Sequence, residues 1–224
     1  MGFEPYTTEE LFDYYQQNIG EFIEFNVNHI YFVDNLQTIA NKNNINESCE
    51  NMNGFTIPLD GYIVAILNNL NGFDSMIALF HELTHVRDFI CFSRKNSIDN
   101  IHQNNLYYAL QIYSEINAHY LGNKLTINFL SKNNLTVKQY MYSSMNLADT
   151  LQTALCCKKM DMESIARCLG HILLYDDFYQ IDNHISHIPD SVSLRLRGAI
   201  QSLLDAYFDN NIEEIDSIIH LLTV

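Results

Sequence analysis

The sequence predicts an α+β protein with a small N-terminal β-sheet, a helix that carries a His-Glu-x-x-His motif, and a mostly helical C-terminal part. Short runs rich in β-branched and aromatic residues occur before residue 70, and apolar residues follow helical spacing from residue 75 onward. Of the 224 residues, 47% are hydrophobic, which is typical of a globular protein. We expect one domain over 1–224, with the sheet and motif helices in 1–135 and a helical subdomain in 136–224.

The first elements follow from local signals. Thr7 and Glu10 stand three residues apart and form a capping box, so a helix is expected over 8–17, ended by Gly20. The stretch 21–33 alternates in part and is rich in Phe, Ile, Tyr and Val, which predicts one strand or a short hairpin. The polar, Asn-rich stretch 41–53 is expected to be a loop.

A second strand and the helices come next. The run GYIVAIL (61–67) is bounded by turn residues and predicts a strand. Apolar residues at helical spacing then predict a helix over 75–92, and a second long helix over 101–130. The remainder is expected to be helical, with helices over 136–158, 162–174, 191–208 and 212–222.

Charge and cysteine content limit the possible partners and compartment. The chain has 12 basic and 27 acidic residues, a net charge of −15, which disfavours binding to nucleic acid. No apolar stretch approaches the ~18 residues of a membrane helix, and the N-terminus lacks a secretory signal. The five cysteines contain no CxxC pair, so we expect thiols and a cytoplasmic location. The sequence gives no signal for an oligomeric state.

The motif itself is His81-Glu82-Leu83-Thr84-His85. On a helix, the i and i+4 spacing places both imidazoles on one face, one turn apart, where they can share a metal ion. The helical prediction for this segment comes from the apolar spacing and is independent of the motif. His81 and His85 are therefore candidate zinc ligands.

Catalytic zinc takes a third protein ligand and leaves a fourth position for water. Glu115 is the best candidate, because it lies thirty residues after His85, enough for a loop and an antiparallel helix. Ala118 and Gly122 share its predicted face, and their small side chains would let the two helices pack closely. His119 is an alternative third ligand. Cys91 is another, although a buried thiol in the core is the more common role of such a residue.

These residues resemble the gluzincin metallopeptidases, the thermolysin-like clan with HExxH on one helix and a glutamate ligand on a later one. The order of strand, HExxH helix and E-x-x-A helix also looks like that of minimal gluzincins and ImmA/IrrE-type peptidases. The resemblance covers residues 61–122. It implies a zinc peptidase in which His81, His85 and Glu115 bind Zn²⁺ and Glu82 is the general base.

The sequence also departs from related patterns. Metzincins continue HExxHxxGxxH, but Asp88 and Cys91 stand at the glycine and third-histidine positions here. Thermolysin-like enzymes often carry an acidic residue four positions after the ligand glutamate, where this chain has His119. Asp88 lies three residues after His85 and could orient an imidazole instead, with a surface salt bridge to Arg87 or a neighbour as the alternative.

The expected chemistry is hydrolysis of a peptide or protein substrate. Zinc lowers the pKa of bound water, Glu82 accepts its proton during attack on the carbonyl, and Glu82 then passes that proton to the leaving amine. A further donor would stabilise the oxyanion, and the candidates are Tyr175, Tyr179, His184 and His187. A peptide could add to the strand at 62–67, unless that strand is an ordinary core or edge strand.

Two other functions stay open at this stage. The first is a non-catalytic zinc-binding regulatory or interaction module, in which His81, His85 and Glu115 only hold the helices together. Retention of Glu82 argues against it. The second is a metal-free helical adaptor, in which both histidines are hydrogen-bonded core residues.

Overall fold

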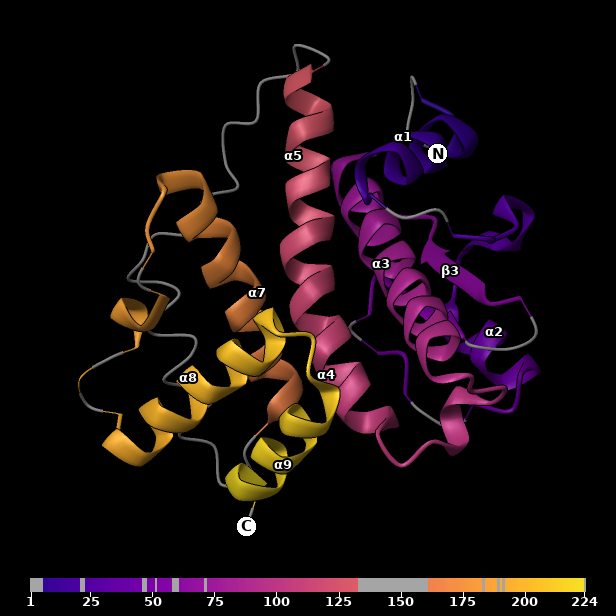
Figure 1. Ribbon diagram of the computed structural model, residues 1–224. Helices are drawn as coiled ribbons and strands as arrows, with labels where there is room; N and C mark the ends of the chain where they lie inside the picture. The colour runs from indigo at the N-terminus through magenta and orange to yellow at the C-terminus, as the bar shows by residue number, and fades with distance from the viewer. Residues whose placement is uncertain are drawn as a thin grey trace. The chain divides into compact units, whose positions relative to one another are not determined.

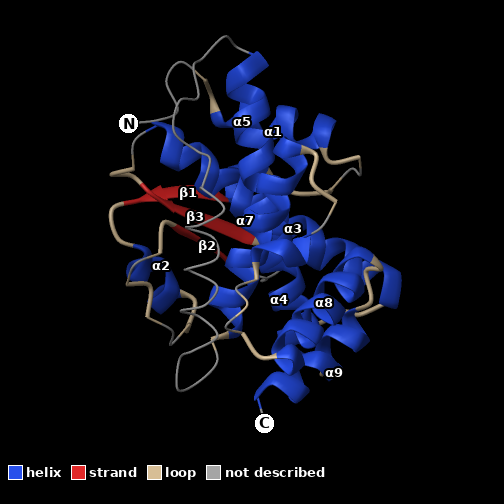
Figure 2. Cartoon of the chain, turned by 90° about the vertical axis from the view of Figure 1, so that its left-hand side faces the viewer, coloured by secondary structure: helices blue, strands red, loops and turns tan. Residues whose placement is uncertain are grey.

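The computed structural model describes residues 6–20, 23–45, 48–50, 52–57, 61–70, 72–132, 161–182, 184–188, 190 and 192–223. It confirms the α+β class, with a three-stranded sheet and a larger helical part (Figures 1 and 2). The chain divides into two compact units, one of residues 1–101 and 121–137 and one of residues 102–120 and 138–224. Residues 102–120 thus belong to the unit that contains the C-terminus. A single folding domain, subdivided at residue 135, stays a prediction.

The first unit begins with helix α1 (Thr8–Asn18), which confirms the predicted capping box. The Thr7 hydroxyl accepts a hydrogen bond from the Glu10 backbone N–H at 3.1 Å, and the Glu10 carboxylate accepts one from the Thr7 N–H at 2.8 Å. Both donors would otherwise be unsatisfied at the helix start. The helix buries Leu11 and Tyr15 completely in the core of this unit.

The sheet has the strand order β1-β3-β2. Strand β3 (Ile63–Leu67) is central; it pairs in parallel with β1 (Ile30–Val33) and antiparallel with β2 (Gly54–Ile57). The register aligns Ile30 with Val64 and Gly54 with Ile66. The middle of β3 is fully buried, as expected for a central strand covered on both faces.

Three expectations for this region need correction. The stretch 21–33 contains one strand, which was one of the two alternatives, but among the described residues 23–33 this strand is limited to Ile30–Val33 and follows a 3₁₀ turn at Val27–His29 (η1). Helix α2 (Leu36–Lys42) and strand β2 were not predicted, although both lie at the borders of the Asn-rich stretch. A peptide cannot add to β3, because strands occupy both of its edges. The alternative, an ordinary core strand, is the observed one.

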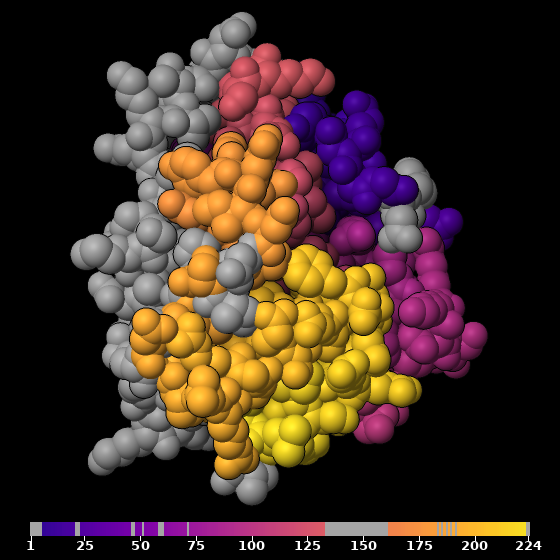
Figure 3. Space-filling model, turned by 60° about the vertical axis from the view of Figure 1, so that its left-hand side comes forward, coloured from indigo at the N-terminus to yellow at the C-terminus, as the bar shows by residue number. Residues whose placement is uncertain are grey.

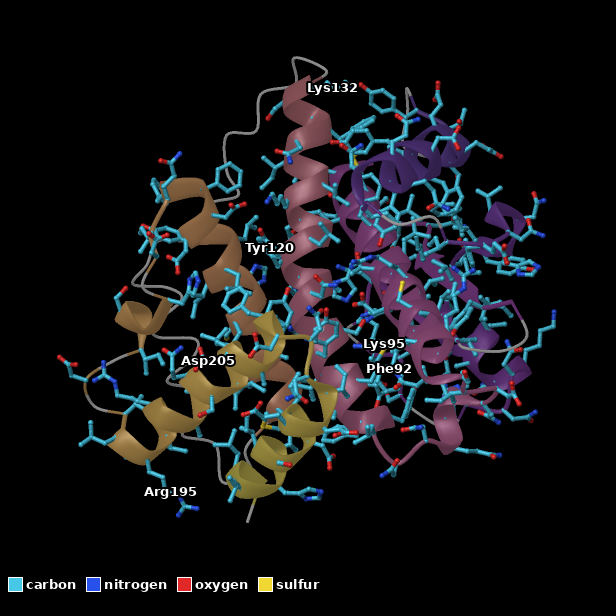
Figure 4. All side chains as sticks on the ribbon, viewed as in Figure 1. Phe92, Lys95, Tyr120, Lys132, Arg195 and Asp205 are labelled. Atoms are coloured by element: carbon cyan, nitrogen blue, oxygen red, sulfur yellow. The ribbon has the colours of Figure 1, made fainter. Side chains whose placement is uncertain are left out.

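The HExxH helix is confirmed and is longer than expected. Helix α3 extends over Gly72–Asn96 and contacts β2, β3 and α5 (Asn123–Lys132). Figure 4 shows Lys132 at the end of α5. Leu79, Phe80 and Leu83 of α3 are fully buried in the core of the first unit. The motif therefore sits on a helix that packs against the sheet and against a second helix.

The long helix expected over 101–130 begins later and contains a π-helical turn. Residues Ile101–Gln103 form a short 3₁₀ helix (η2), and α4 starts at Tyr107 and ends at Asn117. The π-helical segment η3 (Ala118–Gly122) then joins α4 directly to α5. A π turn inserts an extra residue into a helix and is frequent at functional sites.

The described residues of the second unit form helices and the turns between them. Helix α4 packs against α7 (Met162–Tyr179) and α9 (Ile212–Thr223) (Figure 1). Helix α9 packs beside α8 (Leu194–Phe208), and Figure 3 shows their orange and yellow surfaces side by side. The 3₁₀ turn η4 (His184–His187) contacts α7. These helices confirm the predictions over 162–174, 191–208 and 212–222. The helix expected over 136–158 lies outside the described residues.

Two further expectations can be compared with the structure. Within the described ranges, no helix is both long enough and apolar enough to cross a lipid bilayer. No disulfide joins the three cysteines of the described residues, Cys49, Cys91 and Cys168. Burial raises the pKa of the Cys168 thiol to about 11, so this side chain stays protonated at neutral pH.

Candidate functional site

The two motif histidines face each other on α3. The Nε2 atoms of His81 and His85 lie 3.1 Å apart, and the ring centroids are 4.7 Å apart with an interplanar angle of 83°. The i, i+4 spacing predicted this arrangement, because residues one turn apart share a helix face. The stacked ring of Phe89, 6.0 Å from that of His85, continues the same face.

The separation of the two nitrogens fits a shared metal ion. Zinc–nitrogen bonds are about 2.0–2.1 Å, so two nitrogens at a tetrahedral angle on one ion lie about 3.3 Å apart. The 3.1 Å between the Nε2 atoms of His81 and His85 is close to that value. Two imidazoles and a carboxylate are a donor set that zinc accepts.

The backbone of this turn is held by buried contacts. The Thr84 hydroxyl, which is fully buried, donates to the Phe80 carbonyl at 2.7 Å and accepts from the Tyr15 hydroxyl at 3.2 Å. Desolvation strongly raises the pKa of the buried Tyr15 phenol, so it remains a donor at all ordinary pH values. Helix α1 thereby ties the middle of the motif to the core of the first unit.

Gly122 lets a second helix approach the motif. A Cβ at this position would lie 3.0 Å from the His81 backbone nitrogen, 3.1 Å from the His81 Cα and 3.2 Å from the Phe80 carbonyl carbon. These contacts are tighter than most side chains make, so a larger residue here would push the two backbones apart by a few tenths of an ångström. The expectation that Gly122 allows close packing of the two helices is thus confirmed.

Glu82 points toward the sheet of the same unit. It is only 5% exposed, and its Oε2 atom accepts a hydrogen bond from the Thr56 hydroxyl at 2.9 Å. Thr56 lies on β2, which the sequence did not predict as a strand. The Glu82 side chain therefore lies between the HExxH helix and strand β2.

Glu115 and His119 form a pair within the second unit. The Glu115 Oε1 and His119 Nε2 atoms are 3.1 Å apart, and both side chains are less than one-fifth exposed. The ring centroids of His119 and His171 are 4.9 Å apart. A Cβ at Gly170 would lie 2.5 Å from the His119 Cβ, so this glycine of α7 makes room for His119. Both Glu115 and His119 offer metal-ligand atoms.

Asp88 and Cys91 were the other candidates close to the motif. Asp88 is buried and accepts a hydrogen bond from the Arg87 guanidinium at 3.1 Å. The ion pair weighed for Asp88 is thus present, and it joins a buried carboxylate to a partly exposed guanidinium. Cys91 is a partly buried thiol one and a half turns after His85.

The candidate oxyanion donors lie in the second unit. Tyr175 and Tyr179 are neighbours on α7, with ring centroids 4.5 Å apart. His184 is hydrogen-bonded through Nδ1 to the buried Asp176 carboxylate. The side chain of His187 is outside the described part of the chain. None of the four is assigned a role by these contacts.

Within each unit, the structure brings together part of the predicted site. His81, Glu82 and His85 are adjacent in the first unit, and Glu115 lies beside His119 in the second. The complete ligand set of His81, His85 and Glu115 stays a prediction. Sequence analysis missed Gly54, Thr56 and His171. The sequence around Thr56 offers no motif, and only the pairing of β2 with β3 reveals its position.

We compared the chain with protein-family models, with curated proteins and with solved structures, and none of them matches it. The resemblance to gluzincin peptidases therefore rests on the sequence motifs alone.

The close approach at Gly122 can be tested by Gly122→Ala. The added methyl group meets backbone atoms that cannot rotate away, so we expect the free energy of unfolding to fall by about 1–3 kcal/mol, measured by urea denaturation. Gly198→Ala is the matched control, because a Cβ at this position of α8 meets no atom within 4 Å. The control should gain up to about 1 kcal/mol from higher helix propensity. A Gly122→Ala variant as stable as the wild type would contradict the close approach.

Proposed function

We propose that the protein is a zinc-dependent metallopeptidase in which His81, His85 and Glu115 hold the ion and Glu82 is the general base. The observation that carries the proposal is the 3.1 Å separation of the His81 and His85 Nε2 atoms. Two neutral imidazoles at this distance need a proton or a cation between them, and the HExxH spacing is the known arrangement for a shared zinc ion.

The third ligand is supported by the continuity of the helix. Helix α4, the π turn η3 and α5 follow one another without a break, and Gly122 at the end of η3 touches the His81 backbone. Glu115 and His119 precede Gly122 by only seven and three residues, which is two turns or less. Glu115 and His119 each offer one ligand atom, and these two atoms lie 3.1 Å apart. His119 therefore stays open as an alternative ligand to Glu115.

Zinc, when bound, supplies a Lewis acid that lowers the pKa of a coordinated water molecule toward about 7. Glu82 then has two tasks. Its carboxylate would accept a proton from the water that attacks the peptide carbonyl, and it would later donate that proton to the leaving amine. Its position next to His81 in the sequence and its burial beside β2 suit a base that works at one fixed place.

An extended peptide is the substrate that suits the neighbouring sheet. In the described part of the chain β2 pairs only with β3, so β2 is an edge strand. An extended chain can add to such an edge through backbone hydrogen bonds. Thr56 on β2 already contacts Glu82, so a peptide on this edge would pass close to the general base.

We further propose that the protein works in the cytoplasm and binds neither nucleic acid nor membranes. Its net charge is −15, and Lys95, Lys132 and Arg195 lie on three different helices, α3, α5 and α8 (Figure 4). Binding to a phosphate backbone needs clustered basic residues. Thiols instead of disulfides at Cys49, Cys91 and Cys168 are consistent with a reducing compartment.

The metal site predicts about one equivalent of zinc in the purified protein, measured by inductively coupled plasma mass spectrometry. The double variant His81→Ala/His85→Ala should lose the metal, because two of three protein ligands are gone. His220→Ala removes a largely exposed histidine of α9 and should keep it. Full zinc content in the double variant would contradict the site. Loss of zinc in His119→Ala but not in Glu115→Ala would reassign the third ligand.

The role of Glu82 predicts that Glu82→Gln keeps its zinc but loses peptidase activity by at least about 10²-fold, because an amide cannot accept the proton. The substrate should be a quenched-fluorescent peptide that the wild type cleaves, selected from a mixed-sequence library. Unchanged turnover by Glu82→Gln would contradict the mechanism. A wild type that holds zinc but cleaves no peptide in the library would instead favour the non-catalytic zinc-binding module.

A further inference from the structure

The Glu82 side chain meets β2 at two positions of the strand. The Thr56 hydroxyl lies 2.9 Å from the Glu82 Oε2 atom and 3.1 Å from the Glu82 carbonyl oxygen. A Cβ at Gly54 would lie 3.1 Å from the Glu82 Cγ and 3.2 Å from its Oε1 atom. Residues 54 and 56 are two apart on a strand, so both face the same side. Thr56 supplies a hydrogen-bond donor to Glu82, and Gly54 leaves room for the Glu82 side chain.

These contacts restrict the conformation of Glu82. The side chain is 5% exposed, and a buried carboxylate is costly unless it is hydrogen-bonded. The Thr56 hydroxyl can satisfy Oε2 only when the Glu82 torsions bring that atom to β2. The same hydroxyl also lies within reach of the Glu82 backbone oxygen, which shares the hydroxyl's single hydrogen with Oε2, and either acceptor ties the strand to this turn of α3.

The two carboxylate oxygens of Glu82 consequently have different surroundings. Oε2 accepts the hydrogen bond from Thr56, whereas Oε1 lies beside Gly54, where the strand carries no side chain. An alanine at position 54 would press its methyl group against both Oε1 and the Cγ of Glu82. It would also lie 3.0 Å from the Ala65 carbonyl oxygen of β3, so the contact could not be relieved by a simple shift of the strand.

We infer that Thr56 is a positioning residue for Glu82, and that Gly54 leaves room for the Glu82 side chain against β2. This inference rests on the proposed function, because it concerns the general base of that reaction. The hydrogen bond from Thr56 to Oε2 restricts the rotation of the Glu82 carboxylate against β2. Positioning of this kind acts on the chemical step and not on substrate binding.

The first test uses the metal-free protein and needs no activity. Thr56→Val removes the hydroxyl at nearly constant volume, and Glu82→Met removes the carboxylate. In a double-mutant cycle measured by urea denaturation, we expect the two changes to be coupled by about tenfold in the unfolding equilibrium constant. If the effects of the two substitutions on the unfolding equilibrium constant are additive to within about twofold, the inference is overturned. Thr56→Ala, which deletes the same hydroxyl, serves in the cycle if Thr56→Val does not fold.

The second test uses the zinc-loaded protein and the quenched-fluorescent peptide selected with the wild type. Thr56→Val should lower kcat by about 10- to 100-fold, with KM and zinc content unchanged, and Thr56→Ser should restore kcat to within about threefold of the wild type. A Thr56→Val enzyme with the wild-type kcat would overturn the inference while leaving the proposed function intact. A zinc-loaded wild type without any cleavage would contradict the proposed function, whereas the double-mutant cycle still decides whether Thr56 holds Glu82.

Discussion

The proposed metal site depends on the spacing of two imidazoles on one turn of a rigid helix. His81 and His85 face each other with their Nε2 atoms 3.1 Å apart, and neither residue could hold this position on a mobile loop. Helix α3 is fixed by its buried residues Leu79, Phe80 and Leu83. The hydrogen bond from the Tyr15 hydroxyl to the Thr84 hydroxyl also holds it. The hydrophobic core of the first unit therefore sets the geometry of the histidines.

Two glycines beside α3 contribute to the site by leaving room for neighbouring elements. Gly122 permits a second helix to reach the His81 backbone, and Gly54 permits strand β2 to lie against Glu82. In both places a methyl group would meet atoms that cannot move easily. Close backbone approach at glycine is a common way to bring functional side chains from separate elements near one another. The two glycines thus set how closely the backbones approach α3, whereas the polar side chains of the motif supply the metal-binding and acid–base groups.

Sequence periodicity predicted the elements that carry the motif. The apolar spacing of 75–92 and the capping box at Thr7 and Glu10 each correspond to an observed helix, because both signals are local. Strand β2 has only four residues and follows an Asn-rich stretch, so its pairing with β3 could not be predicted from local pattern. The contact of Thr56 with Glu82 spans 26 residues and depends on that pairing. The role proposed for Glu115 was suggested by spacing alone.

X-ray absorption spectroscopy at the zinc edge measures the coordination shell of the zinc-loaded protein. It is the most direct test of a zinc ion bound by His81, His85 and Glu115 with one open position. The proposed site predicts about four nitrogen or oxygen neighbours of zinc at about 2.0–2.1 Å. Two of these neighbours should show the outer-shell scattering of imidazole. One coordination position should be open to exchange with azide or another small anion. A sulfur neighbour at about 2.3 Å, a shell without two imidazoles, or four protein ligands that no anion displaces would contradict the proposed site.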